Sequence, residues 1–429
     1  MRIETQPGAA SQKLSGALSI VLGLMVFSVF LNYVDRGNLS IAAPLIEDEL
    51  HLSAAKLGFL LSSFFWTYGL FQILAGELVD RLNVSWVLAG GFFLWSAATG
   101  ITGLLHGFTA LFVVRLVLGI GESVAYPAYS RILAQYFPVW HRSRANGLLA
   151  AGLSCGPAFG MLAGGFLMSR FGWRSFFMIL GVGSLLWLVP WIRWMPRGAV
   201  NTAATTNAPS PSTWEILSQR SAWGSFCALF CANYNLYLMI TWLPSYLVRE
   251  RHFSMGEMGE IGGAVFATQA VSAIVCGRYG DRLLAAGSSS TRVRKTFLIA
   301  GVVIAGTLLF VSTLVGPALC IVLLMLAGAG MGASASNVWA TTQTMAGPHA
   351  SGRWTGLQCA FANYSGVVAP IVTGFIVKRT GHFSWAFAVA TGFGLLCAAC
   401  WAFFVGPIEP VVWGKKCAVV AGSGREAIA

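Results

Sequence analysis

Four ionisable side chains could do chemistry here, because each interrupts an apolar stretch in which a charge is costly. Asp35 and Arg36 are adjacent, and Arg115 lies seven residues before Glu122. A charged side chain at mid-bilayer costs at least about 2.5–3.5 kcal/mol, so we expect these residues to face a protein interior or watery cavity and to have partners. Their formal charges cancel. Protonating either carboxylate leaves one uncompensated cation, which a substrate carboxylate can neutralise, so the four residues predict a site that couples an anion to a proton.

Helical spacing decides which of these side chains can meet. Arg115 and Glu122 are spaced i and i+7 and share one helix face, as do Tyr33 and Arg36. Asp35 and Arg36 are about 100° apart on a helix, so we expect Asp35 to point partly toward a neighbouring span. The alternative is that Arg115 and Glu122 form a static ion pair, and that Asp35 and Arg36 lie at the outer water interface.

The elements that must position these charges are membrane spans. The chain has 429 residues, of which 56% are hydrophobic and 10% charged, and its mean hydropathy is +0.71. A soluble domain carries about 25% charged residues, so an ordinary cytosolic enzyme is excluded. Because one span needs about 20 apolar residues, the sequence predicts an all-α membrane protein with twelve transmembrane helices. They are expected at residues 17–38, 55–78, 84–105, 107–130, 145–168, 174–195, 222–248, 257–280, 295–316, 318–345, 355–377 and 383–406.

The basic residues predict the orientation of these spans. With both termini in the cytoplasm, 18 Lys and Arg lie on the cytoplasmic side and 7 outside, as the positive-inside rule requires. The net charge of +12 therefore records topology and gives no reason to expect a nucleic acid partner. Nothing in the sequence demands a protein partner, so we expect a monomer in the lipid bilayer.

A polar segment divides the spans into two groups of six. Residues 201–213 are rich in Ala, Thr, Asn, Pro and Ser and lack hydrophobic periodicity, which is typical of a flexible linker. The Gly76 to Arg81 motif recurs as Gly277 to Arg282, 201 residues later, which indicates a duplicated unit. We predict an N-terminal six-helix bundle at 1–196, a cytoplasmic linker at 197–221, a C-terminal six-helix bundle at 222–407 and a cytoplasmic tail at 408–429.

Small residues recur at helical spacing in two of the spans, where they permit close helix contact. The fifth span contains Gly156-Pro157 with Gly160, Gly164 and Gly165, and the eleventh contains Gly366, Pro370 and Gly374. Cys397 and Cys400 lie in an apolar helix, which favours packing over redox chemistry. There is no Walker, Ser-His-Asp or metal-ligand pattern, so we expect neither a cofactor nor a metal, and no enzyme.

These motifs resemble those of the major facilitator superfamily, and the resemblance covers the whole chain. It rests on G-x-x-x-D-R after spans 2 and 8, on Arg115 with Gly119 and Gly121, and on the Gly-Pro fifth span. A narrower similarity is to the anion:cation symporter family, proteobacterial carriers of sugar acids and other carboxylates that resemble sialin. Its segments are Asn32–Ser40, Trp242–Leu247, Gln343–Pro348 and Gly352–Gln358. The resemblance implies two pseudo-symmetric six-helix bundles and a place in the bacterial inner membrane.

The resemblance also implies residue roles. Asp35 and Glu122 would be the proton-coupling groups, and Arg36 and Arg115 charge partners or anion contacts. Other candidate substrate contacts are Tyr33, Tyr68, Gln72, Asn233, Tyr237, Ser336, Trp339, Cys359 and Asn363. Gating is expected from Asp80, Arg81, Asp281 and Arg282. Polar residues of the later spans have an alternative role in hydrogen bonds between helices.

The predicted function is import of a small organic anion by proton symport with alternating access. A sugar acid is one candidate, although Cys359 stands where the resemblance implies Asn in many relatives with such substrates. Asn83, Val84 and Ser85 also replace the Gly and basic residues that usually continue the first signature, which puts the usual charged latch between spans 2 and 11 in doubt. Sodium is left open as the coupling ion. The alternatives are an antiporter or exporter of the same fold, and a non-transporting membrane sensor.

Overall fold

The computed structural model describes residues 15–137, 139–195 and 211–413, and it is helical without β-strands over these ranges. The first half contains α1 (Gly16–Leu50), α2 (Ala54–Arg81), α3 (Val84–Thr102), α4 (Phe108–Ser123), α5 (Ala125–Tyr136), α6 (Val139–Leu185) and α7 (Leu188–Trp194). The second half contains α8 (Thr213–Leu217), α9 (Arg220–Ser245), η2 (Tyr246–Glu250), α10 (Met255–Ala285), α11 (Ser290–Val311), α12 (Pro317–Asn363), α13 (Ser365–Thr380), α14 (Ser384–Ala399) and η3 (Cys400–Phe404).

The described helices account for the twelve predicted spans. Ten stretches of the described chain are long and apolar enough to cross a membrane. One of them, Ala145–Trp194, turns back at Gly172, whose φ of 73° lies in the left-handed region that favours glycine. Counting its two arms separately and adding the 28-residue helix α2 gives twelve spans. The all-α prediction is therefore confirmed.

The first span is longer than predicted, and this changes where two of the charges lie. Residue 38 was the expected end, but α1 continues to Leu50, where His51 closes it with a left-handed backbone. Asp35 and Arg36 therefore lie in the middle of a helix and not at the outer water interface. Asp35 is 1% exposed, and the side chain of Arg36 is 6% exposed. Both charges can be buried within the helix, because α3 and α4 supply their partners.

The predicted linker and tail both contain ordered structure. Ser212 and Glu215 form a reciprocal capping box at the start of α8, and this short helix buries Ile216 against the C-terminal bundle. The backbone N–H of Val411 donates to Met345 O at 2.8 Å, which ties the start of the predicted tail to α12. Residues 197–210 and 414–429 of these two segments lie outside the described chain, and the division of the chain into four segments stays a prediction.

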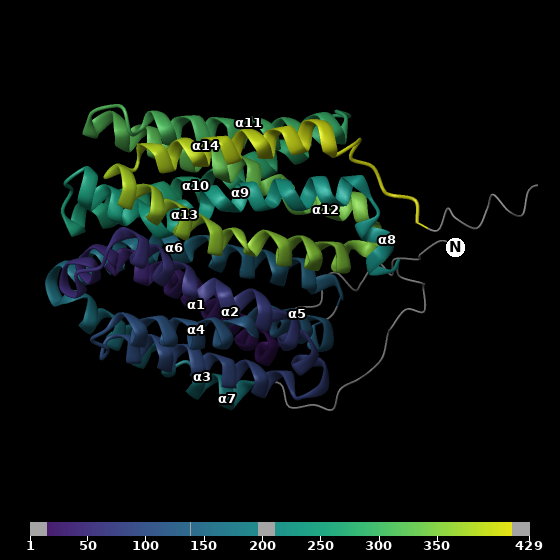
Figure 1. Ribbon diagram of the computed structural model, residues 1–429. Coiled ribbons are helices and arrows are strands. Elements are labelled where there is room, and N and C mark those ends of the chain that lie inside the picture. The colour runs from purple at the N-terminus through teal and green to yellow at the C-terminus, as the bar shows by residue number, and fades with distance from the viewer. Residues whose placement is uncertain (1–14, 138, 196–210, 414–429) are drawn as a thin grey trace, which may run out of the picture.

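The helices form two bundles that meet mainly where α1 packs on α9, α2 on α13 and α6 on α10 (Figure 1). Glycines set the closeness of two of these contacts. A Cβ at Gly58 of α2 would lie 2.5 Å from Pro370 O of α13, and one at Gly165 of α6 would lie 2.7 Å from Gly259 Cα of α10. The predicted role of the small residues in close helix packing is confirmed.

Contact between the bundles is tight at one end of the molecule only. We call this the sealed end; it is formed by the C-terminal end of α1, the N-terminal ends of α2 and α10, and η2. Farther along α2, a Cβ at Gly69 or Gly76 would have no atom of another helix within 4 Å, and the same holds for Gly147 at the start of α6. The two bundles therefore diverge from the sealed end toward the end where α2 finishes.

An arginine bridges the bundles at the sealed end. Arg249 of η2 donates to Pro44 O of α1 at 2.8 Å and pairs with the neighbouring carboxylates of Glu47 and Asp48. Nearby, Ser40 Oγ of α1 donates to Ile240 O of α9 at 2.6 Å. Charge and hydrogen bonds thus add to glycine packing in holding this end shut.

Two substitutions in α6 test this asymmetry. We expect Gly165→Leu to destabilise the sealed arrangement by about 1–3 kcal/mol, because the new side chain meets the α10 backbone. Gly147→Leu is the matched control, since it gains the same helix propensity in open space. The melting temperature of the purified protein should fall for the first variant and not for the second. Equal melting of the two would contradict the sealed-end description.

Candidate functional site

Arg36 is the centre of the site, and it projects from the middle of α1. Its Nε lies 3.4 Å from Glu122 Oε2 of α4. The guanidinium carbon is 4.6 Å from the ring centre of Tyr33 and 4.4 Å from that of Tyr68. Planar guanidinium groups stack favourably on aromatic faces, so the two tyrosines fix the plane of the cation while the carboxylate fixes its direction.

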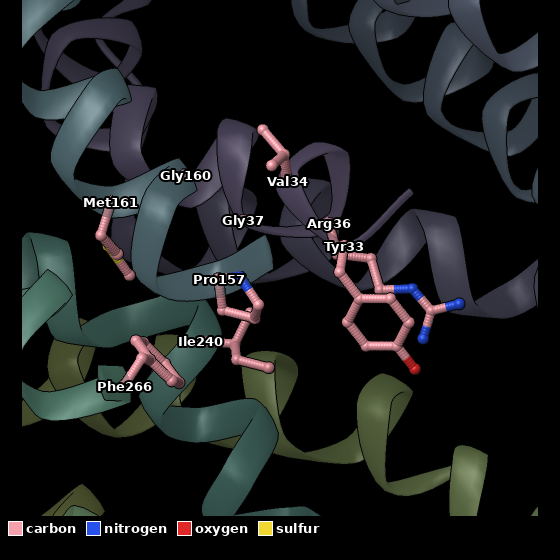
Figure 2. Close-up of a pocket in the computed structure, with 9 residues that line it drawn as sticks. All are labelled: Tyr33, Val34, Arg36, Gly37, Pro157, Gly160, Met161, Ile240 and Phe266. Atoms are coloured by element: carbon pink, nitrogen blue, oxygen red, sulfur yellow. The ribbon is translucent and has the colours of Figure 1, made fainter. Parts of the chain in front are cut away.

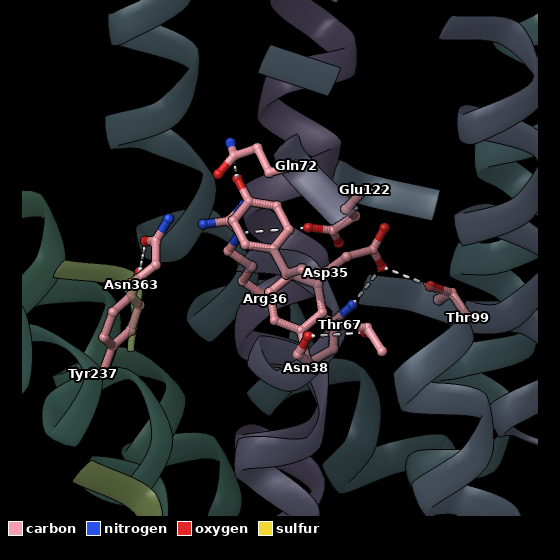
Figure 3. Close-up of polar contacts among 11 residues, drawn as sticks. Asp35, Arg36, Asn38, Thr67, Gln72, Thr99, Glu122, Tyr237 and Asn363 are labelled. Carbon is pink, nitrogen blue, oxygen red and sulfur yellow. Dashed lines mark hydrogen bonds and ion pairs between the residues drawn. The ribbon is translucent and has the colours of Figure 1, made fainter. Parts of the chain in front are cut away.

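Asp35 points away from Arg36, as the helical spacing predicts. Its Oδ1 accepts hydrogen bonds from Asn38 Nδ2 at 2.9 Å and from Thr99 Oγ1 of α3 at 3.2 Å. Figure 3 shows Asp35 turned toward Thr99. The first helix therefore presents one carboxylate to α3 and one guanidinium to α4.

Arg115 completes the group of four and lies on α4, two turns before Glu122. It is 3% exposed, lies 5.5 Å from the ring centre of Phe64 and is within electrostatic range of both Asp35 and Glu122. The ion pair that Glu122 makes among the described residues is with Arg36, so the static pair between Arg115 and Glu122 is not the arrangement observed. Gly119 permits this geometry, because a Cβ there would lie 2.4 Å from Phe64 O of α2.

Each of the four ionisable residues keeps a buried polar atom without a hydrogen-bond partner in the described chain. These atoms are Asp35 Oδ2, Arg36 Nη2, Arg115 Nε and Glu122 Oε1. A buried donor or acceptor left unpaired costs about 1–3 kcal/mol, and more when it is charged. These four atoms are therefore open to further hydrogen-bond partners, either water or a bound ligand.

A small hollow between the bundles opens beside Arg36. It has about 10 Å³ of space for the centre of a water molecule, which is room for roughly one water. Tyr33 and Arg36 lie on one side of it in Figure 2, and Pro157, Ile240 and Phe266 on the other. The hollow is too small for an organic acid, so its walls must move apart before one can enter.

The second bundle contributes a tyrosine to the same region. Tyr237 of α9 donates its hydroxyl hydrogen to Asn363 Oδ1 of α12 at 3.0 Å (Figure 3). Its ring packs edge-on against Phe65 of α2, with ring centres 4.5 Å apart, and so reaches the first bundle. Cys359 is half-buried and within electrostatic range of Tyr237. Two of the predicted contacts from spans 7 and 11 are thus bonded to each other.

The remaining predicted contacts are placed less centrally. Gln72 Nε2 donates to Tyr68 Oη at 3.5 Å, which brings it to the edge of the site. Ser336 bonds its own helix at Ala333 O, and Asn233 makes no hydrogen bond with the described residues. Trp339 is 43% exposed on α12. The structure therefore brings Gln72 to the edge of the charged group, and none of the other three is hydrogen-bonded to that group among the described residues.

The predicted gating residues lie at the end of α2 and α10 that faces away from the sealed end. Arg81 is exposed and pairs within its own helix with Glu77 at 3.5 Å. Asp281 and Arg282 are also exposed. The side chain of Asp80 lies outside the described residues. The gating role stays a prediction.

Several residues of the site were not predicted from the sequence. Thr99 lies in an apolar helix with no local sign that it would reach Asp35. Asn38 could have been found, because it lies one helical turn after Asp35. Phe64 is one of 29 phenylalanines, and only the packing of α2 against α4 distinguishes it from the others.

A double-mutant cycle tests the energetic weight of the central pair. We expect Arg36→Met to destabilise the protein by about 3–5 kcal/mol, because it leaves the Glu122 carboxylate buried without its cation. Arg36→Met with Glu122→Gln should recover part of this loss. Arg81→Met, which breaks an exposed pair, should cost no more than about 1 kcal/mol. Thermal melting of these variants beside the unaltered protein measures the effect, and a double variant no more stable than Arg36→Met would contradict the pairing.

Comparison with known proteins agrees with this architecture. The sequence profile of the Major Facilitator Superfamily matches residues 25–363 and 283–418. The "Hexuronate transporter" of Bacillus subtilis is 30% identical over 91% of this chain and 95% of its own length. The "Probable galactarate/D-glucarate transporter GudP" of the same organism is 28% identical over 95% and 97%.

The fold is shared with a solved structure. A bacterial homologue of the human lysosomal transporter Spinster, in an inward-facing and unoccupied conformation, superposes with a TM-score of 0.77 at 20% identity, covering 91% of this chain and 97% of that one. With twelve spans in two bundles and a profile match over most of its length, this chain belongs to the major facilitator superfamily.

Proposed function

We propose that the protein is a secondary active transporter that imports a small organic carboxylate together with a proton. The relatives named above carry the names of hexuronate and galactarate/D-glucarate transporters, which supports an organic anion as the substrate. A central site between two bundles, sealed at one end, is the arrangement that alternating access requires.

The observation that carries this proposal is the set of four unpaired buried atoms. Arg36 Nη2 and Arg115 Nε are free donors, and they are suited to a carboxylate. Asp35 Oδ2 and Glu122 Oε1 are free acceptors, and each is suited to a proton. The site therefore offers two donors that suit an anion and two acceptors that suit protons, which are the two species that a proton symporter binds.

Charge balance explains why the two species would move together. With all four residues ionised, the empty site is neutral, since two cations offset two carboxylates. A proton alone leaves a net positive charge and an anion alone a net negative one, and an uncompensated buried charge is costly. A proton with a monocarboxylate restores neutrality. A dicarboxylate would need two protons, and Asp35 and Glu122 can accept one each.

The sealed end is the outer end in this proposal. The excess of basic residues at the opposite end, where α2 and α10 finish, favours a cytoplasmic location for that end and for both termini. The bundles would rock about the central site, so that Arg249 releases Glu47 and Asp48 when the outer side opens. The inner membrane of a bacterium is the location we propose.

The body of the substrate would contact aromatic and sulfur-bearing side chains. Tyr33, Phe266 and Met161 line the hollow, and Cys359 lies near Tyr237. In the second bundle, the hydrogen-bonded pair of Tyr237 and Asn363 would offer the substrate a polar contact. Uptake assays should therefore include D-glucuronate, D-glucarate and an aromatic acid such as benzoate.

Transport by purified protein in vesicles tests the proposal. An inward proton gradient should accelerate uptake of at least one of these acids, and replacing the proton gradient by a sodium gradient should not. We expect Glu122→Gln to lower accumulation by at least about tenfold, while exchange of internal for external substrate continues. A neutral amide keeps the shape of the site but cannot release a proton.

Controls separate coupling from folding. Asp35→Asn should lose accumulation in the same way, whereas Glu260→Gln, at an exposed carboxylate of α10, should transport normally. Normal accumulation by both Glu122→Gln and Asp35→Asn would remove these residues from the coupling mechanism. Proton movement opposite to the substrate would establish an antiporter, and binding without flux would establish a sensor.

A further inference from the structure

A second hollow lies on the outside of the C-terminal bundle, far along the chain from the charged site. It is an open groove of about 740 Å³ along the first four turns of α11. No helix of the first bundle contributes to its lining. Its lining residues are Ser289, Thr291, Arg292, Lys295, Thr296, Ile299, Ala300 and Val303.

The groove is polar and basic at one end and apolar at the other. Arg292 and Lys295 lie in its first two turns, together with three hydroxyl side chains. Ile299, Ala300 and Val303 follow on the same helix face. At 1.5 Å per residue, Arg292 and Val303 are roughly 16 Å apart along the axis. This is the length of a lipid headgroup and the upper part of an acyl chain.

The basic end is available to a ligand. Arg292 is exposed and makes no ion pair with a described residue. Lys295 Nζ donates to Val405 O at 2.6 Å, which anchors the ammonium and leaves its other hydrogens to point elsewhere. The lining contains no acidic side chain. Arg294 lies between them in the sequence, but its guanidinium donates a hydrogen bond to Ala340 O at 2.7 Å and does not line the groove.

The position of the groove fits a membrane lipid better than a soluble ligand. It begins where α11 enters the bundle, at the end of the molecule that carries the excess of basic residues, and its apolar part continues along an outward face on which Ile304 is 47% exposed. Basic pockets at the cytoplasmic side of membrane proteins are suited to anionic headgroups, because each cation near the surface adds to the attraction.

We propose that this groove binds an anionic phospholipid, with Arg292 and Lys295 on the phosphate and one acyl chain along Ile299 to Val303. The lipid would bridge the start of α11 and the segment after η3, because Lys295 is held by Val405 O. The inference is independent of the transport proposal, since no residue of the charged site takes part.

Melting of the full-length protein in detergent tests the groove. Dioctanoyl phosphatidylglycerol, added below its micelle concentration, should raise the melting temperature, because a ligand that binds the folded state stabilises it. Dioctanoyl phosphatidylcholine tests the need for negative charge. Glycerol phosphate, which has the anionic group without the chains, tests the need for the apolar part. We expect little or no rise with either.

Variants place the effect on the groove. Arg292→Gln and the double variant Arg292→Gln with Lys295→Gln should lose at least half and nearly all of the rise, respectively. Arg278→Gln, at an exposed arginine of α10 outside the groove, should keep it. The single variant protects the test against misfolding, because the Arg292 side chain has no ion pair to lose. If glycerol phosphate raises the melting temperature as much as the lipid does, the groove is a simple anion site and the lipid proposal is wrong. The proposal is also wrong if the double variant keeps the full rise in melting temperature, or if Arg278→Gln loses as much of that rise as the double variant does.

Discussion

The ion pair between Arg36 and Glu122 is the constraint on which the rest of the site depends. It joins the middle of α1 to the end of α4, and the two side chains are 6% and 0% exposed. Taking two charges out of water is costly, and their attraction offsets that cost only with good geometry and further partners. Tyr33 and Tyr68 supply part of this on the cation, but Glu122 Oε1 stays unpaired. The ion pair therefore fixes the position of the two side chains but leaves one carboxylate oxygen without a hydrogen-bond partner.

Helix packing differs between the two ends of the bundles, and the proposed movement depends on this difference. Glycine contacts at the sealed end bring backbone against backbone, whereas glycines at the other end of α2 and α6 meet nothing from another helix. Packed interfaces of this kind have discrete arrangements and do not deform continuously. The one-water hollow beside Arg36 belongs to one such arrangement, and an organic acid needs another. In the proposed mechanism, charge balance in the site and rocking of the bundles therefore act together.

The sequence predicted the spans because a bilayer imposes a length and a composition on each of them, and it predicted the four charges because lipid makes them conspicuous. The predicted end of the first helix was wrong. The charges of Asp35 and Arg36 suggest the membrane–water interface until their partners on α3 and α4 are known. Thr99 could not be found, because its contact with Asp35 is 64 residues away in sequence. Ile216 was assigned to a flexible linker although Ser212 and Glu215 carry the spacing of a capping box, which was a missed local signal. Local rules determine the helices, and only tertiary contact determines their neighbours.

Proton uptake on anion binding is the sharpest test of the charge balance in the site. Calorimetric titration of the purified protein in buffers with different ionisation enthalpies reports the number of protons taken up with each ligand. We predict uptake of about one proton per bound monocarboxylate such as D-glucuronate, and of about two per bound dicarboxylate such as D-glucarate. In Glu122→Gln, the number of protons taken up with the same acid should be lower by one. Binding of either acid with no proton uptake would contradict this mechanism.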